Sequence, residues 1–125
     1  GSGVLAFYAY QTGFRNIEAF DYDETAIQNA KQNALNNDIP ETYFYKADLE
    51  KWVPDKHYHV IAANVSTILL KTQLNKLTEA LSKHGILILS GIGATHHKEF
   101  KGLLNGLHCI DDCSDGEWSA FIFQK

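Results

Sequence analysis

Two short apolar runs, separated by one helical segment, restrict the fold classes that this chain can adopt. Residues 60–64 and 86–90 are small or apolar almost throughout, as strands covered on both faces of a sheet are. Between them, leucines recur at helical spacing from Leu70 to Leu81. Alternating strands and helices are typical of a parallel sheet. We therefore expect an α/β protein built on a mostly parallel sheet.

The remaining segments extend this alternation. Two shorter strands are expected over residues 17–20 and 43–46. We predict four helices. The first covers residues 4–10 and has a glycine C-cap at Gly13, and the second follows an N-cap at Asp23 and runs to about Asn36. The third runs from Ser66 or Thr67 to Gly85, and the fourth from Thr95 to about Leu104.

The C-terminal segment differs from the rest. Strands expected over residues 107–110 and 118–124 flank Ser114-Asp115-Gly116, and Asp-Gly between two such runs signals a hairpin. In the last strand Trp118 lies on one face with Ala120 and Ile122, while Phe121 and Phe123 lie on the other. A strand that is apolar on both faces belongs inside a sheet. We therefore expect an antiparallel C-terminal hairpin whose final strand inserts into the sheet.

Composition sets the class of protein and of partner. The chain has 125 residues, 45% of them hydrophobic, which is enough for the core of one domain spanning residues 1–125. No apolar run approaches the roughly 20 residues that cross a bilayer, and no targeting leader opens the chain, so we expect no membrane partner. A net charge of −4 gives nucleic acid no electrostatic support but suits a basic protein. Cys109 and Cys113 are expected to be free thiols in a reducing cytoplasm.

The chain begins on glycines rather than on a strand. A doubly wound sheet usually opens with a strand that leads into a glycine turn, but here Gly1-Ser2-Gly3 runs directly into Val4. We expect a truncated glycine loop, so that the first central strand is missing and the domain is N-terminally truncated. The alternative is that residues 1–3 were added ahead of the fold.

The glycines and one aspartate form the first candidate site. Glycines before a helix let a ligand approach the backbone N–H groups, and Asp21 ends the next expected strand. A carboxylate at that place accepts hydrogen bonds from both hydroxyls of a ribose. Gly1, Gly3 and Asp21 therefore indicate a nucleoside site, or else a tight turn and a helix cap. Asp23 suits the cap better, which favours Asp21 for the ligand.

Two further polar positions follow strands of the same sheet. Asp48 could accept a hydrogen bond from the amino group of a base, while the backbone N–H of Leu49 donates to a ring nitrogen of that base. The alternative, of at least equal weight, is that Asp48 caps the next turn. Asn64 ends the run 60–63, and its amide offers a donor and an acceptor where a reacting amine could be held. A turn-forming role for Asn64 is the alternative.

Other chemistries have little support. His96 and His97 are adjacent, so they point apart, and no histidine–cysteine spacing suits zinc. We expect no metal site. Ser2 lacks the setting of a nucleophile elbow, and no Walker lysine follows the glycines.

Several motifs resemble one known family over essentially the whole chain. They are Gly-Ser-Gly-Val-Leu-Ala at 1–6, Phe-Asp-Tyr-Asp at 20–23 with Ala26-Ile27, Ala-Asn-Val at 63–65, Gly-Ile-Leu-Ile-Leu-Ser-Gly-Ile at 85–92 and Gly-Glu-Trp at 116–118. Their order and spacing are similar to those in the catalytic domain of ribosomal protein L11 methyltransferases, which have a Rossmann-like class I methyltransferase fold. The first glycine of that family's loop and its small N-terminal domain are absent from these 125 residues.

The resemblance implies a function and a cofactor. It implies S-adenosylmethionine-dependent N-methylation of amino groups on a protein, a basic ribosomal protein in this family. It places Gly1 and Gly3 beneath the methionine moiety, Asp21 on the ribose, and Asn64 beside the methyl group and the incoming amine. Asp48 carries over only weakly.

Two other readings stay open. A nicotinamide-dependent oxidoreductase fits Gly1, Gly3 and Ala6 as Gly-x-Gly-x-x-Ala, with Asp21 at a suitable distance, although the inserted terminal strand argues against it. A non-catalytic methyltransferase-like fragment is favoured if the central strand is truly absent, because its neighbours would then have exposed edges. The sequence carries no signal for an oligomeric state.

Overall fold

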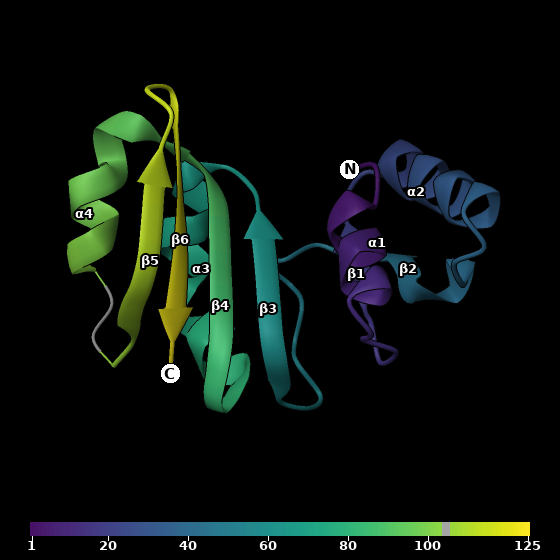
Figure 1. Ribbon diagram of the computed structural model, residues 1–125, viewed down its shortest axis with the longest axis horizontal. Coiled ribbons are helices and arrows are strands. Elements are labelled where there is room, and N and C mark those ends of the chain that lie inside the picture. Colours follow the sequence, from purple (N-terminus) through teal and green to yellow (C-terminus); the bar gives the residue numbers. More distant parts are fainter. Residues whose placement is uncertain (104–105) are drawn as a thin grey trace. The chain divides into compact units, whose positions relative to one another are not determined.

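A computed structural model describes residues 1–103 and 106–125 of the chain (Figure 1). The chain forms two compact units, Gly1–Val53 and Pro54–Lys125. Whether they make up one catalytic domain stays a prediction. No helix in the described ranges combines the length and the apolarity that a membrane crossing requires.

The first unit holds a two-stranded parallel sheet and two helices. Its elements are α1 (Val4–Gln11), β1 (Ala19–Asp21), α2 (Glu24–Asn36), the 3-10 turn η1 (Glu41–Tyr43) and β2 (Phe44–Lys46). β1 pairs with β2 in parallel, with Asp21 opposite Lys46. A small apolar core of Ala6, Ala30, Ala34, Ile39 and Phe44 joins α1 and α2 to β2. The predicted helices are confirmed, β1 begins two residues later than expected, and no strand precedes α1 within the described residues.

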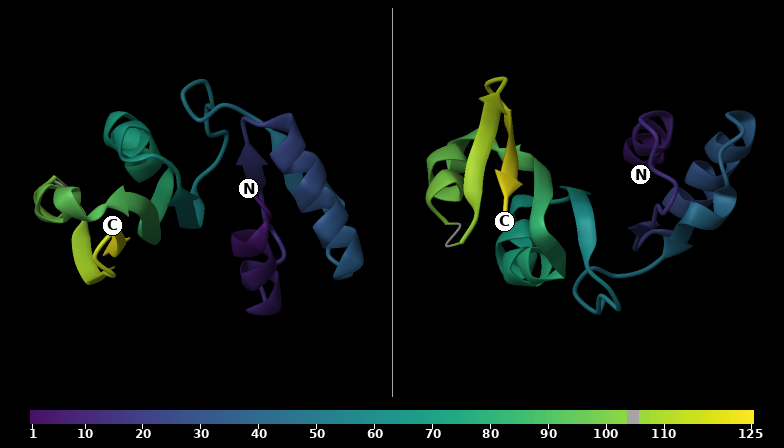
Figure 2. Two further views of the ribbon diagram at one scale, coloured as in Figure 1. Left: turned by 90° about the horizontal axis from the view of Figure 1, so that it is seen from above. Right: turned by 60° about the horizontal axis from the view of Figure 1, so that its bottom comes forward.

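The second unit is a four-stranded mixed sheet. Its elements are β3 (Tyr58–Asn64), α3 (Thr67–Ala80), β4 (Leu81–Gly93), the 3-10 turn η2 (Ala94–His96), α4 (His97–Gly102), β5 (His108–Ser114) and β6 (Trp118–Gln124). The strand order is β3-β4-β6-β5, with β3 and β4 parallel and β6 antiparallel to both of its neighbours. This confirms that the final strand inserts into the sheet (Figure 2).

The helices of the second unit cover one face of its sheet. Leu87 pairs with Phe123, and Leu89 with Phe121, and all four side chains are buried. Phe100 of α4 stacks on Phe121 with 6.2 Å between ring centroids, and α3 lies behind the strands in Figure 1. Burial alternates along β6 as predicted, since Phe121 is buried whereas Trp118 is 55% exposed.

The predicted extension of the third helix to Gly85 is wrong. α3 ends at Ala80, and Leu81 adopts an extended conformation, pairs with Tyr58 and starts β4. Lys125 Nζ donates to the carbonyl oxygens of Thr78 and Leu81, both at 2.9 Å, which satisfies two acceptors at the helix end. Gly85 instead lies in a tight bend of β4, where a Cβ would be 2.8 Å from Ser82 O.

Smaller differences concern the C-terminal segments. β5 runs to Ser114 rather than Ile110, because a bulge between Cys109 and Asp111 lets pairing with β6 continue. The fourth helix begins at His97 after η2, and its predicted end near Leu104 lies outside the described residues. Both cysteines are free, as expected.

Candidate functional site

The chain enters α1 through a left-handed turn at Gly3. Gly3 has φ 88°, and a Cβ there would lie 2.9 Å from Phe7 Cζ and 3.0 Å from Phe44 Cε1. Both the backbone conformation and the packing therefore require glycine. The turn is also held from α2, because Asn33 Nδ2 donates to Ser2 O at 3.2 Å.

Asp21 lies at the end of β1, where its carboxylate contacts the Gly1 amino group. Its Oδ1 accepts a hydrogen bond from Asp23 N at 3.0 Å, and its side chain is 26% exposed. Partial burial raises the pKa of Asp21, whereas the hydrogen bond from the Asp23 N–H lowers it. The structure thus brings an ionised carboxylate to the glycine turn.

The neighbouring aspartates have local structural roles. Asp23 caps α2 by accepting from Thr25 N at 2.9 Å, as predicted. Asp48 Oδ1 accepts a hydrogen bond from Glu50 N at 3.0 Å. Asp48 therefore caps the following turn, which was the alternative role expected for it. Leu49 is buried, with 8% of its surface exposed. A role for Asp48 and the Leu49 N–H toward a base stays a prediction.

A shallow cavity lies beside the glycine turn. It is lined by Gly1, Ser2 and residues of α2 that include Asn29 and Asn33, but not by Asp21. Gly1, which contacts Asp21, belongs to the lining of this cavity.

Asn64 ends β3 in the second unit, opposite Ser90 of β4. Its side chain is exposed, and within residues 1–103 and 106–125 no hydrogen bond engages the carboxamide. The amide therefore has its donor and its acceptor available for a ligand.

The loop after β4 lies against Asn64. Gly91 follows Ser90 with φ 78°, and a Cβ there would lie 2.7 Å from Asn64 Oδ1. Thr67, the first residue of α3, accepts a hydrogen bond from Gly93 N through Oγ1 at 3.0 Å. Sequence reasoning assigned no site role to either residue: Thr67 was expected only as a possible start of the third helix, and Gly91 only as part of the motif at 85–92.

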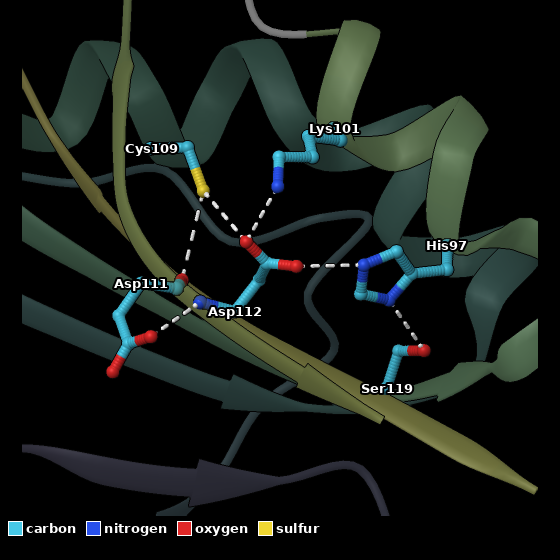
Figure 3. A network of polar contacts seen from close by, with 6 residues as sticks. All are labelled: His97, Lys101, Cys109, Asp111, Asp112 and Ser119. Atoms are coloured by element: carbon cyan, nitrogen blue, oxygen red, sulfur yellow. Dashed lines mark hydrogen bonds and ion pairs between the residues drawn. The ribbon is translucent and has the colours of Figure 1, made fainter. Parts of the chain in front are cut away.

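A polar network lies between α4 and the C-terminal hairpin (Figure 3). His97 is 2.9 Å from Ser119 Oγ through Nδ1 and 2.7 Å from Asp112 Oδ2 through Nε2. Lys101 Nζ donates to Asp112 Oδ1 at 2.7 Å. The hydrogen bond from Lys101, and next that from His97, holds the pKa of Asp112 below its ordinary value.

This network is structural rather than nucleophilic. Ser119, His97 and Asp112 contact one another in that order, as in a catalytic triad. Ser119 is only 2% exposed, however, so no substrate can reach its hydroxyl. The adjacent His96 turns to Glu99 instead, with 3.0 Å between Nδ1 and Oε2. Among the described residues no three histidine, cysteine or acidic side chains gather as metal ligands.

Residues 1–125 match a protein family described as "Ribosomal protein L11 methyltransferase (PrmA)". A relative with the name ribosomal protein L11 methyltransferase, from Lactobacillus gasseri, is 36% identical over 100% of this chain. The chain spans 40% of the length of that relative.

Solved structures show the same fold. A ribosomal protein L11 methylase from Lactobacillus delbrueckii subsp. bulgaricus matches with a TM-score of 0.89 and 26% identity, over 98% of this chain and 64% of that chain. An S-adenosylmethionine-dependent methyltransferase from Clostridium acetobutylicum matches with a TM-score of 0.78 over 99% of this chain and 80% of that chain; at 11% identity it shows the fold alone. The predicted Rossmann-like methyltransferase fold is thereby confirmed.

Proposed function

The chain belongs to the ribosomal protein L11 methyltransferase family, and from this premise we propose that it provides the catalytic part of an S-adenosylmethionine-dependent N-methyltransferase. The substrate is an amino group of a protein, and the protein is a basic ribosomal protein. The observation that carries the proposal is the partly exposed Asp21 carboxylate at the end of β1, beside the left-handed turn at Gly3.

The residues of the first unit fit the cofactor. A ribose needs an acceptor for two hydroxyls, and Asp21 rather than Asp23 is assigned to it because the Asp23 side chain caps α2. A side chain at Gly3 would collide with Phe7 and Phe44, so the turn presents bare backbone. In our proposal Gly1 and Gly3 lie beneath the methionine moiety and Asp21 binds the ribose.

Asn64 is proposed to hold the reacting amine. The cofactor, when bound, supplies a methyl group already activated by its positively charged sulfur. The protein therefore needs no nucleophile of its own; it must orient a neutral amine and exclude water. In this proposal Asn64 Oδ1 accepts a hydrogen bond from an N–H of the neutral amine, which leaves the nitrogen lone pair free to face the methyl carbon of the bound cofactor. Desolvation lowers the pKa of a lysine amine and supplies the neutral form.

The substrate is proposed from charge and from the relatives. The chain carries 15 acidic against 11 basic residues, which favours a basic partner over nucleic acid. The Lactobacillus gasseri relative is named for a ribosomal protein substrate. We propose the same class of substrate here, modified in the cytoplasm.

A binding comparison tests the cofactor class. S-adenosylhomocysteine, the product left after methyl transfer, is expected to raise the melting temperature of the full-length protein by several degrees at about 100 times its Kd. NADH at the same concentration is expected to leave the melting temperature unchanged, although both ligands contain adenosine. Thermal-shift measurement gives both values. Stabilisation by NADH alone would identify an oxidoreductase instead.

A further inference from the structure

Gly91 occupies a place where any side chain would be strained. Its φ of 78° is left-handed, which L side chains rarely adopt. A Cβ there would lie 2.7 Å from Asn64 Oδ1 and 2.8 Å from Val65 O. Val65 O is a backbone atom and cannot move aside. A side chain at position 91 would therefore displace the Asn64 carboxamide and strain the turn after β3.

We propose that Gly91 is a positioning residue for methyl transfer, whose bare backbone seats the Asn64 carboxamide facing the amine. This inference rests on the proposed function. Asn64 is exposed and its carboxamide makes no hydrogen bond among the described residues, so its side chain is not oriented by polar partners. The space left by the missing Cβ of Gly91 therefore admits the Asn64 oxygen at the position it takes.

The loop that carries Gly91 is itself fastened to α3. Thr67 Oγ1 accepts from Gly93 N at 3.0 Å and lies 3.5 Å from Gly91 O. Thr67 lies three residues after Asn64, so β3, the start of α3 and the loop after β4 are held together around this contact. Removing the Thr67 hydroxyl is thus a second way to displace Gly91, because it releases the loop without adding an atom beside Asn64.

Two variants and one control separate positioning from simple strain. Gly91→Ala places an alanine in the left-handed conformation and its Cβ against Asn64 Oδ1. We expect it to lower kcat by about 10- to 100-fold, as misplacement of a reacting group does. Thr67→Val removes the hydrogen bond from Gly93 N and should lower kcat by about 3- to 10-fold. Gly106→Ala is the control: Gly106 also has a left-handed φ of 90°, but nothing lies within 4 Å of its Cβ position. We expect its kcat to stay within about twofold of wild type.

A double variant tests whether Gly91 acts through Asn64. In the full-length protein, with S-adenosylmethionine and purified ribosomal protein L11 as probes, Gly91→Ala should cost less than about twofold in kcat once Asn64 is alanine. KM for the protein substrate should change little in either background. An equal loss of kcat with and without Asn64 would overturn the proposal.

Nuclear magnetic resonance gives a readout that needs no activity. The side-chain amide signal of Asn64, assigned by its loss in Asn64→Ala, should shift in Gly91→Ala and Thr67→Val but not in Gly106→Ala. An unmoved signal in both test variants would overturn the proposal. If wild-type protein transfers no methyl group while the signal still shifts, the proposed function fails and the steric coupling of Gly91 to Asn64 stands. Where Gly91→Ala does not fold, Thr67→Val decides by the same criteria.

Discussion

Replacing Asn64 by alanine is expected to lower kcat for methyl transfer by about 100- to 1,000-fold. The reason is that the amine loses its acceptor and with it the orientation of the nitrogen lone pair. Mass spectrometry of the methylated substrate over time measures the rate. Affinity for S-adenosylhomocysteine should stay within about threefold, because the ribose is assigned to Asp21.

Asn64→Gln is the matched variant for this experiment. It keeps the carboxamide but displaces it by one methylene group, so we expect a loss of kcat that approaches that of alanine. A turnover in Asn64→Ala equal to that of wild type would remove Asn64 from the mechanism and leave it as the turn residue at the end of β3.

Replacing Asp21 by alanine is expected to weaken S-adenosylhomocysteine binding by about 10- to 100-fold. An ionised acceptor facing two ribose hydroxyls contributes about 1.5–3 kcal/mol through each charged hydrogen bond, and part of that contribution is offset by desolvation. Isothermal titration calorimetry on the full-length protein measures the change in Kd. Asp21 is a partly exposed carboxylate that accepts a backbone N–H, so it is ionised throughout the neutral range.

Asp23→Ala is the control two residues away. Asp23 caps α2 through Thr25 N, so its loss should lower the free energy of unfolding by about 1 kcal/mol while Kd stays nearly unchanged. If Asp21→Ala binds S-adenosylhomocysteine as tightly as wild type, Asp21 serves only the turn that its Oδ1 forms with Asp23 N.

The parts of the fold that were predictable depend on local patterns. Alternating apolar faces placed the last strand at residues 118–124, and its apolar character on both faces placed it inside the sheet, as β6 shows between β4 and β5. Asp23 was recognisable as a cap because a short acidic side chain precedes a helical repeat. These features are decided within a few residues of sequence.

The features that sequence reasoning missed depend on contacts between distant segments. Leucine spacing continues through Leu81, so periodicity could not show that Leu81 leaves α3 to pair with Tyr58. The contact between Gly91 and Asn64 depends on the register that places Asn64 opposite Ser90, across 26 residues of chain. Likewise His97 meets Asp112 and Ser119 only because β6 lies inside the sheet beside β5.

Methyl transfer itself tests the central claim most directly. The full-length protein is incubated with S-adenosylmethionine and purified ribosomal protein L11, and the substrate is analysed by intact-mass and peptide mass spectrometry. We predict mass increments of whole methyl groups, each replacing one hydrogen of an amino group and each matched by one molecule of S-adenosylhomocysteine. An L11 of unchanged mass, under conditions in which the protein is folded and binds S-adenosylhomocysteine, would contradict the account.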